Sequence, residues 1–528
     1  MTVSLPSPDA PFTTLAALIR SHACQQPGHA ALRDDQQTLS YAQLDALMDR
    51  VAAALQRDGV QPGQAIAICA LNSVCYAALF LGALRAGVVV APLAPSSTAE
   101  SLASMLRDAQ AGHLFLDQAA QDLVPADTGL QCISLDGVAP GRAFEDWLAP
   151  EGAQPAAVSL APEAPFNIIY SSGTTGTPKG IVQSHGMRWT HINRGGVYGY
   201  GPEGTTLVAT PLYSNTTLVV FFPTLGSGGC VVLMPKFDAA RYLQLAQQHR
   251  VTHTMLVPVQ YQRIMALPQF GEHDLSSFQA KFCTSAPFRA ELKADVVARW
   301  PGSLTEFYGM TEGGGTCILE AHLHPDKLHT VGQPAEGHDI RLIDEQGCEV
   351  APGADGEVVG HSASMMSGYH GQPAKTREAE WFDATGKRFI RTGDVGRFDA
   401  DGFLTLFDRR KDMIISGGFN IYPSDLEAQL RAHPAVDDVA VVGVPSEQWG
   451  ETPVAYVVSR TGQPARPEEI MGWYNQQAGK TQRLADLRFI AELPRSAIGK
   501  VLKRELRDQY ASLSSISRCP SRDISHEP

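Results

Sequence analysis

Residues 170–180 read Tyr-Ser-Ser-Gly-Thr-Thr-Gly-Thr-Pro-Lys-Gly, and four of the five side chains from Ser171 to Thr175 carry a hydroxyl group. A short apolar run comes just before, as the end of a strand would. Glycine lets the backbone approach a ligand closely, so N–H groups and hydroxyls can surround phosphate oxygens while Lys179 adds a mobile positive charge. The spacing is not that of a Walker loop, because Pro178 stands where that loop needs a glycine. A polar loop without a ligand is the alternative, but so many hydroxyl and glycine residues beside a lysine predict a phosphate loop.

Composition places the chain among globular proteins. Of its 528 residues, 44% are hydrophobic and 18% are charged, which is typical of a chain with two or more domains. The net charge of −13 argues against nucleic acid as a partner, because phosphate backbones need a basic surface. None of the nine cysteines has CxxC spacing, so neither a zinc site nor a disulfide framework is indicated. A reducing, cytoplasmic compartment is therefore expected.

The sequence gives no sign of a targeting or membrane segment. Residues 1–12 lack the basic-then-apolar order of a signal peptide. The most apolar run, Tyr76–Leu93, is interrupted by Gly, Arg and Pro and is short for a membrane span. We expect a buried helix there, followed by a strand at residues 88–90.

The pattern of apolar residues changes along the chain. Roughly the first three hundred residues alternate between helical and strand patterns, such as a helix at Tyr41–Leu55 and a strand at Ala65–Cys69. This alternation predicts layered α/β subdomains with parallel strands. The Ala/Pro-rich stretch Gly152–Pro165 is expected to be an exposed linker before residues 170–180.

Short strands separated by turn residues predict a β-rich subdomain at about residues 335–408. We therefore place a large N-terminal domain at 1–409 and a small C-terminal α/β domain at 410–510. Residues 511–528 are Ser-rich and lack apolar periodicity, so we expect a disordered tail.

The 170–180 segment resembles the phosphate loop of the adenylate-forming superfamily, which includes acyl-CoA synthetases, adenylation domains and luciferases. Four further segments match motifs of that superfamily in the same order, up to residue 503. The resemblance implies a mobile C-terminal domain and the use of ATP with Mg²⁺. It also implies nucleotide contacts from the phosphate loop and from a loop near adenine: Ser171, Ser172, Gly173, Thr174, Thr175, Gly176, Lys179, Ser285, Ala286 and Pro287.

Residues 308–312 read Tyr-Gly-Met-Thr-Glu and match the Y-G-x-T-E motif of the superfamily. Taken alone, such a segment is a simple turn about as often as it is a functional motif. The resemblance implies that Tyr308 and Thr311 contact the nucleotide, Thr311 at the α-phosphate, and that Glu312 holds Mg²⁺. A hard cation prefers carboxylate and phosphate oxygens, which agrees with this assignment.

Residues 391–394 read Arg-Thr-Gly-Asp, the R-T-G-D motif of the superfamily. Asp394 would accept hydrogen bonds from both ribose hydroxyls. The segment after residue 408 resembles the domain hinge, with Arg409 at the ribose or phosphate and Lys411 as the hinge residue. Asp408 stands where the family usually has glycine, a departure that could stiffen the hinge.

The C-terminal part carries two further matches. Residues 494–503 resemble the P-x-x-x-x-G-K-x-x-K ending of the superfamily, which implies that Lys500 stabilises the transition state of adenylation. Gly417 and Gly418 would line a tunnel for the pantetheine arm of CoA, and Trp449 lies in a segment that relatives place beside that arm. We expect residues 447–451 to form a loop.

The acyl pocket is where the sequence departs most from its relatives. Many of them have a histidine or aromatic residue at the position of Ser214. No acidic residue occurs between Glu203 and Asp238, which argues against a substrate with a free α-amino group. We assign Ser214, Asn215, Gly309 and Gly313 to the pocket, and expect the Gly313–Gly315 run to leave space there.

The sequence as a whole indicates an AMP-forming acyl-CoA synthetase, an acid–thiol ligase. It would convert a carboxylate and ATP to acyl-AMP and then transfer the acyl group to CoA, with Mg²⁺ as cofactor. The acid would be a short branched, hydroxylated or aromatic one. An enzyme that loads a separate carrier protein is the alternative, and a nucleotide-binding protein without catalysis is a third hypothesis. The sequence does not indicate an oligomeric state.

Overall fold

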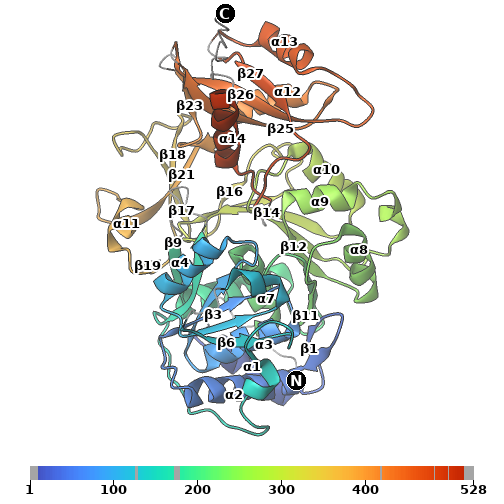
Figure 1. Cartoon of the computed structure of the whole chain (residues 1–528), viewed down its shortest axis with the longest axis vertical. Helices are drawn as coiled ribbons and strands as arrows, with labels where there is room; N and C mark the ends of the chain where they lie inside the picture. The colour runs from blue at the N-terminus through green and yellow to red at the C-terminus, as the bar shows by residue number, and fades with distance from the viewer. Residues whose placement is uncertain are drawn as a thin grey trace, which may run out of the picture. The chain divides into compact units, whose positions relative to one another are not determined.

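The computed structural model describes residues 10–124, 129–171, 179–416, 419–446, 448–480, 482–496 and 499–516 (Figure 1). The chain forms two compact units. Unit 1 comprises Met1–Glu349, Val359–Thr392 and Phe398–Thr405, and unit 2 comprises Val350–Val358, Gly393–Arg397 and Leu406–Pro528. The expected boundary at residue 409 therefore lies inside unit 2, which also takes in two short upstream segments.

The phosphate-loop strands of unit 1 lie in an eight-stranded sheet. Its central strands are parallel, and only β9 and the two-residue β19 next to it run antiparallel to their neighbours. The strands, in spatial order, are β19 (Gly368–Tyr369), β9 (Lys179–Ser184), β8 (Pro165–Ser171), β4 (Val89–Leu93), β3 (Ala65–Cys69), β5 (His113–Leu116), β6 (Gln131–Ser134) and β7 (Arg142–Ala143).

A nine-stranded sheet forms the other large layer of unit 1. Six neighbouring strands, β14, β13, β12, β10, β11 and β1, pair in parallel. Strand β2 at one edge and strands β15 and β16 at the other pair antiparallel. The strands, in spatial order, are β16 (Gln333–Pro334), β15 (Thr316–Glu320), β14 (Ser303–Gly309), β13 (Ala280–Cys283), β12 (His253–Leu256), β10 (Thr205–Val208), β11 (Cys230–Leu233), β1 (Ala30–Arg33) and β2 (Thr38–Ser40).

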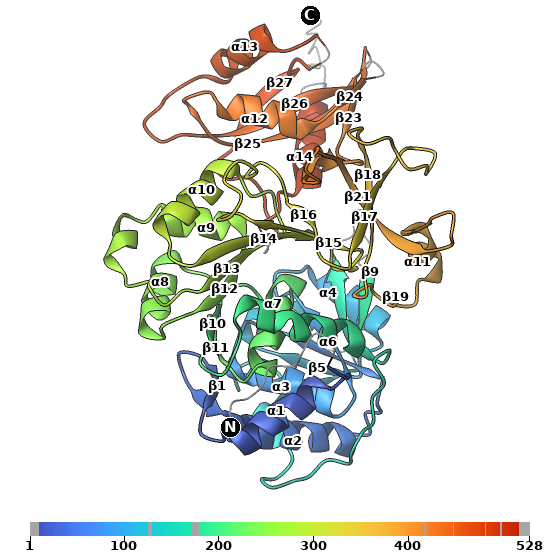
Figure 2. The ribbon, with the colours of Figure 1, turned by 180° about the vertical axis from the view of Figure 1, so that it is seen from behind.

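Helices connect the parallel strands, and Figures 1 and 2 show α8, α9 and α10 along strands β10–β14. The helices of unit 1 are α1 (Leu15–Gln25), α2 (Tyr41–Arg57), α3 (Val74–Arg85), α4 (Ala99–Ala109), α5 (Phe144–Trp147), α6 (His185–Asn193), α7 (Asn215–Gly226), α8 (Ala239–Gln248), α9 (Pro258–Met265), α10 (Ala290–Arg299) and α11 (Pro373–Glu378). Three 3₁₀ helices cover Gln118–Leu123, Arg194–Tyr198 and Pro268–Glu272.

Two five-stranded sheets complete the fold. One has the order β17 (Asp339–Ile343), β18 (Gly356–His361), β21 (Arg388–Phe398) and β20 (Glu380–Phe382), with β22 (Leu404–Arg409) paired to β21. The other has the order β24 (Phe419–Ile421), β23 (Ile414–Ser416), β26 (Gly450–Ser459) and β25 (Val436–Ser446), with β27 (Asp486–Phe489) paired to β26. The helices of unit 2 are α12 (Pro423–Arg431), α13 (Pro467–Gln477) and α14 (Lys503–Ile516).

The predicted α/β fold class is confirmed, with two local corrections. Helix α14 extends to Ile516, so residues 511–516 are helical and not part of a disordered tail. Strand β26 begins at Gly450, so the expected loop at 447–451 is shorter, and β25 and β26 form a hairpin in which Ser446 pairs with Gly450. Residues 511–516 contain no glycine or proline that would end the helix begun at Lys503, which explains the first difference.

Helix α3 accounts for the apolar run that starts near Tyr76. Ten of its twelve residues are buried, from Val74 to Leu84, because the helix packs inside the core of unit 1. A helix that is apolar on all sides is typical of a protein interior as well as of a bilayer. Within the described residues, no helix is both long enough and apolar enough to cross a membrane.

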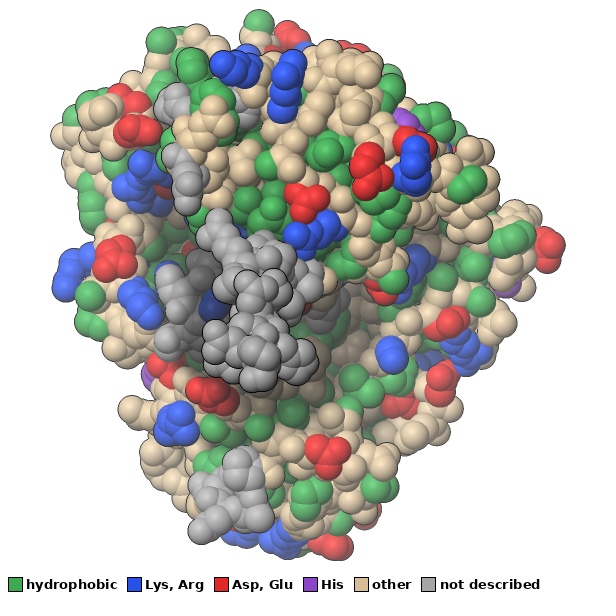
Figure 3. Space-filling view, turned by 45° about the horizontal axis from the view of Figure 1, so that its top comes forward, with side chains coloured by type: hydrophobic (Ala, Val, Ile, Leu, Met, Phe, Trp, Pro, Cys, Tyr) green, Lys and Arg blue, Asp and Glu red, His purple; other side chains and the backbone are tan. Residues whose placement is uncertain are grey.

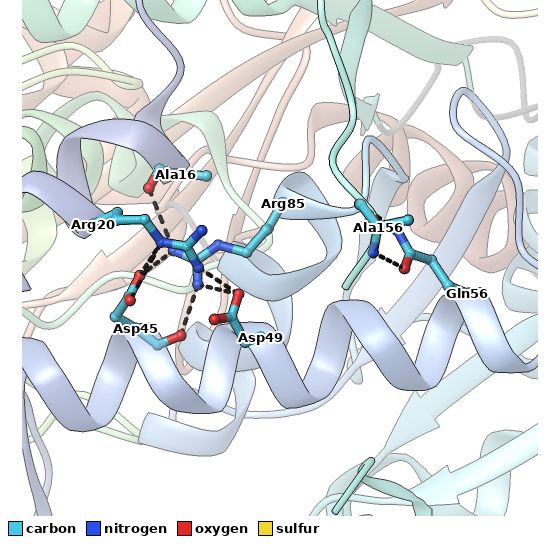
Figure 4. Close-up of polar contacts among 7 residues, drawn as sticks. All are labelled: Ala16, Arg20, Asp45, Asp49, Gln56, Arg85 and Ala156. Carbon is cyan, nitrogen blue, oxygen red and sulfur yellow. Dashed lines mark hydrogen bonds and ion pairs between the residues drawn. The ribbon is translucent and has the colours of Figure 1, made fainter. Parts of the chain in front are cut away.

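Charged groups also occur inside this helical layer. Figure 4 shows Arg20, Arg85, Asp45 and Asp49 joined across α1, α2 and α3. Arg85, only 7% exposed, donates to Asp49 Oδ1 at 2.9 Å, to Asp45 Oδ1 at 2.5 Å and to the Asp45 carbonyl at 2.7 Å. Removing one partner of a buried ion pair strongly lowers the stability of a protein, because the other charge is then left uncompensated.

Figure 4 also shows how the Ala/Pro-rich segment after Gly152 is held. The Gln56 side chain on α2 donates to the Ala156 carbonyl at 2.9 Å and accepts from the Ala156 N–H at 2.8 Å. One amide therefore fixes both polar groups of a backbone unit. On the face in Figure 3, basic and acidic side chains lie interspersed over the described surface.

We expect Arg85→Met to lower the free energy of unfolding by about 3–5 kcal/mol, because Asp45 and Asp49 keep their charge but lose a buried partner. Arg241→Ala is the control: its ion pair with Asp35 lies at the surface of the same unit, at 41% and 51% exposure. That control should lose no more than about 1 kcal/mol. Urea unfolding followed by circular dichroism measures both, and equal losses would contradict a structural role for the buried cluster.

Candidate active site

The predicted phosphate loop connects two paired strands of unit 1. Strand β8 ends at Ser171 and β9 begins at Lys179, and these two residues are partners in the antiparallel register. The loop between them, residues 172–178, lies outside the described residues, as do the predicted contacts of Ser172, Gly173, Thr174, Thr175 and Gly176. The pairing nevertheless fixes where both ends of the loop must be.

Lys179 and Glu312 are brought together by a tyrosine that the sequence analysis missed. The Lys179 Nζ lies 4.9 Å from the centre of the Tyr369 ring, and the Tyr369 hydroxyl donates to Glu312 Oε1 at 2.9 Å. Burial and the Glu312 carboxylate raise the pKa of Tyr369. Strand β19 places this ring by pairing with β9, where Tyr369 faces Ile181. Nothing in the sequence around Tyr369 distinguishes it from the other tyrosines.

The Tyr308–Glu312 segment starts with the last two residues of β14, which pair with Cys317 and Thr316 of β15, and then turns back toward β15. The Thr311 carbonyl accepts from Gln183 Nε2 at 2.8 Å, and the Glu312 carbonyl accepts from the Met366 N–H at 2.8 Å. Both backbone groups are thus held by residues from distant parts of unit 1. The segment is a fixed connection between strands and not a free turn.

The expectation that Gly313–Gly315 leaves space for a substrate is wrong. A Cβ atom at Gly313 would lie 1.7 Å from the Ser364 carbonyl oxygen, and its φ of +73° is in the left-handed region. At Gly314 a Cβ would lie 2.6 Å from Ile390, and at Gly315 2.4 Å from Ile340. Protein atoms of the same unit already fill these positions, so the glycines allow close packing of the backbone.

The predicted adenine loop is joined to α7 through a pair of hydroxyls. Ser285 Oγ and Thr216 Oγ1 lie 2.5 Å apart, and Thr284 Oγ1 donates to the Phe307 carbonyl at 2.7 Å. Ser285 has a φ of +82°, which is uncommon for a residue other than glycine. Backbone strain of this kind is found most often at functional sites. Ala286 is partly buried and Pro287 is exposed.

Ser214 has a structural contact that competes with the predicted role in the pocket. It is the N-cap of α7, and its hydroxyl accepts from the Thr216 N–H at 3.3 Å. Asn215 is the first residue of α7, and its Oδ1 lies 3.4 Å from Gln183 Nε2. The small residue at 214 is therefore explained by helix capping.

Aromatic rings pack beside the Tyr308–Glu312 segment. Tyr198 meets Phe307 edge-on with ring centres 5.7 Å apart, and it meets Phe282 in the same manner at 5.2 Å. Phe282 and Phe307 lie on the neighbouring strands β13 and β14, 5.6 Å apart. Tyr198 and Phe307 are only partly buried, so this cluster presents aromatic surface next to the motif.

Unit 2 gathers the remaining predicted nucleotide residues. The Arg409 Nε lies 3.3 Å from Asp394 Oδ1, and the Arg410 N–H donates to the Gly393 carbonyl at 2.8 Å. Lys500 is partly buried in the same unit, near Asp394 and Asp412 and near the cations Arg409 and Lys411. Burial, followed by the Arg409 charge, lowers the pKa of Lys500 to about 8.

Asp408, the departure at the predicted hinge, is bound within unit 2. Its Oδ2 accepts from the Ser424 N–H in the first turn of α12 at 2.8 Å. Lys503 Nζ lies 3.7 Å from Asp408 Oδ1 and 3.0 Å from Glu427 Oε1. A glycine could make none of these side-chain contacts, so Asp408 ties the end of β22 to α12 and α14.

The predicted CoA residues are only partly described. Gly417 and Gly418 lie outside the described residues. Trp449 sits at the tip of the β25–β26 hairpin, partly buried, with Lys480 Nζ 5.5 Å from its ring centre. Its backbone N–H donates to Ser446 Oγ at 3.3 Å.

Comparison with known proteins agrees with this arrangement. The family model for the AMP-binding enzyme matches residues 19–370, and the model for the C-terminal domain of that enzyme matches residues 425–500. A feruloyl-CoA synthase from an Amycolatopsis species is 33% identical over 500 residues, covering 92% of this chain and 97% of the relative. An indoleacetate–CoA ligase from Aromatoleum aromaticum is 33% identical, covering 94% of this chain and 98% of the relative.

Solved structures give the same result. ATP-bound MatB from Rhodopseudomonas palustris has a TM-score of 0.84 at 28% identity, covering 95% of this chain and 100% of that chain. The family models together with these relatives span almost the whole chain. The protein therefore belongs to the AMP-binding enzyme family, and it is most like the AMP-forming acyl-CoA ligases of that family.

Proposed function

We propose that this AMP-forming acyl-CoA ligase activates an aromatic carboxylic acid. The observation that carries the proposal is the cluster of Tyr198, Phe282 and Phe307 beside the Tyr308–Glu312 segment. Aromatic rings bind other rings edge-on or offset, with a gain beyond area burial. The names of the feruloyl and indoleacetate relatives, both aromatic acids, support this class over a short branched acid.

In the first step a carboxylate oxygen attacks the α-phosphorus of ATP, and pyrophosphate leaves. Lys179 would hold phosphate oxygens, and Thr311 would contact the α-phosphate. Asp394 would accept hydrogen bonds from the ribose hydroxyls, with Arg409 beside it. Lys500 would bring its positive charge to the oxygens on which negative charge develops, and fixed charges of this kind supply a large part of catalysis.

The Glu312 carboxylate is suited to bind Mg²⁺. Glu312 Oε1 accepts one hydrogen bond from Tyr369, which leaves further lone pairs of the carboxylate for a cation. The described residues contain no cluster of three or more acidic, His or Cys ligands. Mg²⁺ is usually held by one or two carboxylates together with substrate phosphates, and Glu312 would supply one such carboxylate. When bound, the ion would neutralise charge on the phosphates.

In the second step the CoA thiol loses its proton to solvent and its sulfur attacks the acyl carbon; the bond from that carbon to the phosphate oxygen breaks, and AMP leaves with its electron pair. The small C-terminal domain would rotate about Lys411 between the two steps. Gly417, Gly418 and Trp449 would then guide the pantetheine arm. The Trp449 ring offers an apolar face against which an uncharged arm can pack.

An acid panel tests the substrate class. We expect pyrophosphate release to be fastest with hydroxycinnamic or arylacetic acids and at least about tenfold slower with short branched acids, because these cannot use the aromatic cluster. The same assay with CoA and with an acyl-carrier protein distinguishes the two acceptors. A preference for short aliphatic acids would contradict the aromatic proposal, and thioester formation on carrier protein alone would replace CoA as the acceptor.

Lys500→Ala should slow acyl-AMP formation by about 100- to 1,000-fold, the usual effect of removing one group that stabilises developing charge. Thioester formation from pre-made acyl-AMP should continue, because Lys500 has no role in that step. Single-turnover measurement of each half-reaction checks this. Equal losses in both would count against the assignment of Lys500 to adenylation alone.

The lowered pKa of Lys500 predicts a pH dependence. The charged form is the active one, so kcat/KM for ATP in adenylation should fall as pH rises through about 8. In Lys500→Arg the guanidinium keeps its charge throughout this range, so the fall should disappear even if the rate is lower. A pH profile from 6.5 to about 9.5 for both proteins is the measurement. An identical alkaline fall in Lys500→Arg would assign it to another group.

A further inference from the structure

A buried polar network lies behind the Tyr308–Glu312 segment. Arg188 on α6 is 1% exposed, and Asn167 on β8 and Gln183 on β9 are completely buried. The Arg188 Nε donates to Asn167 Oδ1 at 3.1 Å, and its terminal NH2 group donates to Gln183 Oε1. Asn167 Nδ2 also donates to Gln183 Oε1, at 3.0 Å. Two donors thus converge on one amide oxygen.

The network holds a cation without an acidic partner in the part of the chain that the structure describes. Arg188 lies 5.9 Å from the Phe166 ring centre and 5.4 Å from that of Phe222, and its other terminal nitrogen has no hydrogen-bond partner among the described residues. Burial lowers the pKa of Arg188 to about 9, so it remains charged at neutral pH. Burying a charge is costly, and amide oxygens provide only part of the compensation.

The other end of the Gln183 amide reaches two predicted site segments. Its Nε2 donates to the Thr311 carbonyl at 2.8 Å and lies 3.4 Å from Asn215 Oδ1. Because Arg188 and Asn167 both donate to the amide oxygen, the orientation of the amide is fixed with its N–H groups toward Thr311 and Asn215. A single side chain therefore links the motif segment to the first residue of α7.

We propose that Gln183, oriented by Arg188, is a positioning residue for adenylation that holds the Thr311 segment and the start of α7 in register. The inference rests on the proposed function, in which Thr311 contacts the α-phosphate and α7 borders the acid. Neither Gln183 nor Arg188 would touch a substrate. They would set the distance between two segments that do, and displacements of about 1 Å can cost about a hundredfold in rate.

Gln183→Glu separates this role from stability. The substitution keeps the size of the side chain and adds a carboxylate opposite Arg188, but it removes the N–H donor to Thr311 and Asn215. We expect a melting temperature close to that of the unchanged protein and a kcat for acyl-AMP formation lower by about 10- to 100-fold. The KM for ATP should change by less than about threefold, because the loss appears in the transition state.

Gln260→Glu is the matched control. Gln260 is also buried, and its Nε2 donates to the Ala209 carbonyl at 3.0 Å while its Oε1 accepts from the Val257 N–H. The described residues show no hydrogen bond or ion pair between this side chain and a cation. The control should therefore lower the melting temperature strongly but leave kcat of the folded enzyme nearly unchanged. The two variants thus predict opposite effects on stability and rate.

Pyrophosphate release is measured with the full chain and with whichever acid the enzyme turns over fastest. The test of Gln183 therefore does not depend on that acid being aromatic. Should Gln183→Glu not accumulate as folded protein, Gln183→Met removes the same donor without adding charge. A Gln183 variant with unchanged kcat would overturn the proposal. So would a Gln183 variant whose lower kcat comes with a loss of melting temperature as large as that of Gln260→Glu. A selective loss of kcat in a stable variant would support it.

Discussion

The antiparallel pairing of β8 with β9 is the constraint on which the candidate site of unit 1 depends. It sets Ser171 opposite Lys179 and so fixes both ends of the phosphate loop. Strand β9 also places Gln183 next to the Thr311 carbonyl. The other edge of β9 pairs with β19, which places Tyr369 next to Glu312. Main-chain hydrogen bonds between these strands thus place the side chains that reach the Tyr308–Glu312 segment.

The surroundings of Lys179 and Arg188 in unit 1 differ from those of Lys500 in unit 2, although unit 1 also contains paired cations such as Arg85. Unit 1 holds Lys179 next to a ring and Arg188 among amides and rings, so these cations meet polarisable or neutral groups. Unit 2 sets Lys500 among charges of both signs, with Arg409 already paired to Asp394. Lys179 is therefore the cation of unit 1 that we expect to meet a phosphate, whereas the buried Arg188 compensates amide oxygens inside the unit.

Much of the fold and the outline of the site could be predicted from local sequence. Helix α2 and strand β3 follow directly from apolar periodicity, and motifs such as residues 391–394 carry their chemistry within a few residues. Tyr369 and Gln183 could not be found this way, because their partners lie 57 and 128 residues away. The Gly313–Gly315 run was misread for the same reason, since the atoms that fill its space come from residues 340, 364 and 390.

The hydroxyl pair of Thr216 and Ser285 has a consequence for any attempt to broaden the acids that the enzyme accepts. Thr216 belongs to the helix assigned to the acid, and Ser285 belongs to the loop assigned to adenine and holds a left-handed backbone. A substitution of Thr216 that removes its hydroxyl therefore takes a hydrogen-bond partner from Ser285, a strained residue of the loop assigned to adenine. Acid scope and nucleotide affinity would then not be independent variables in directed evolution, and gains at one are expected to require compensating changes at the other.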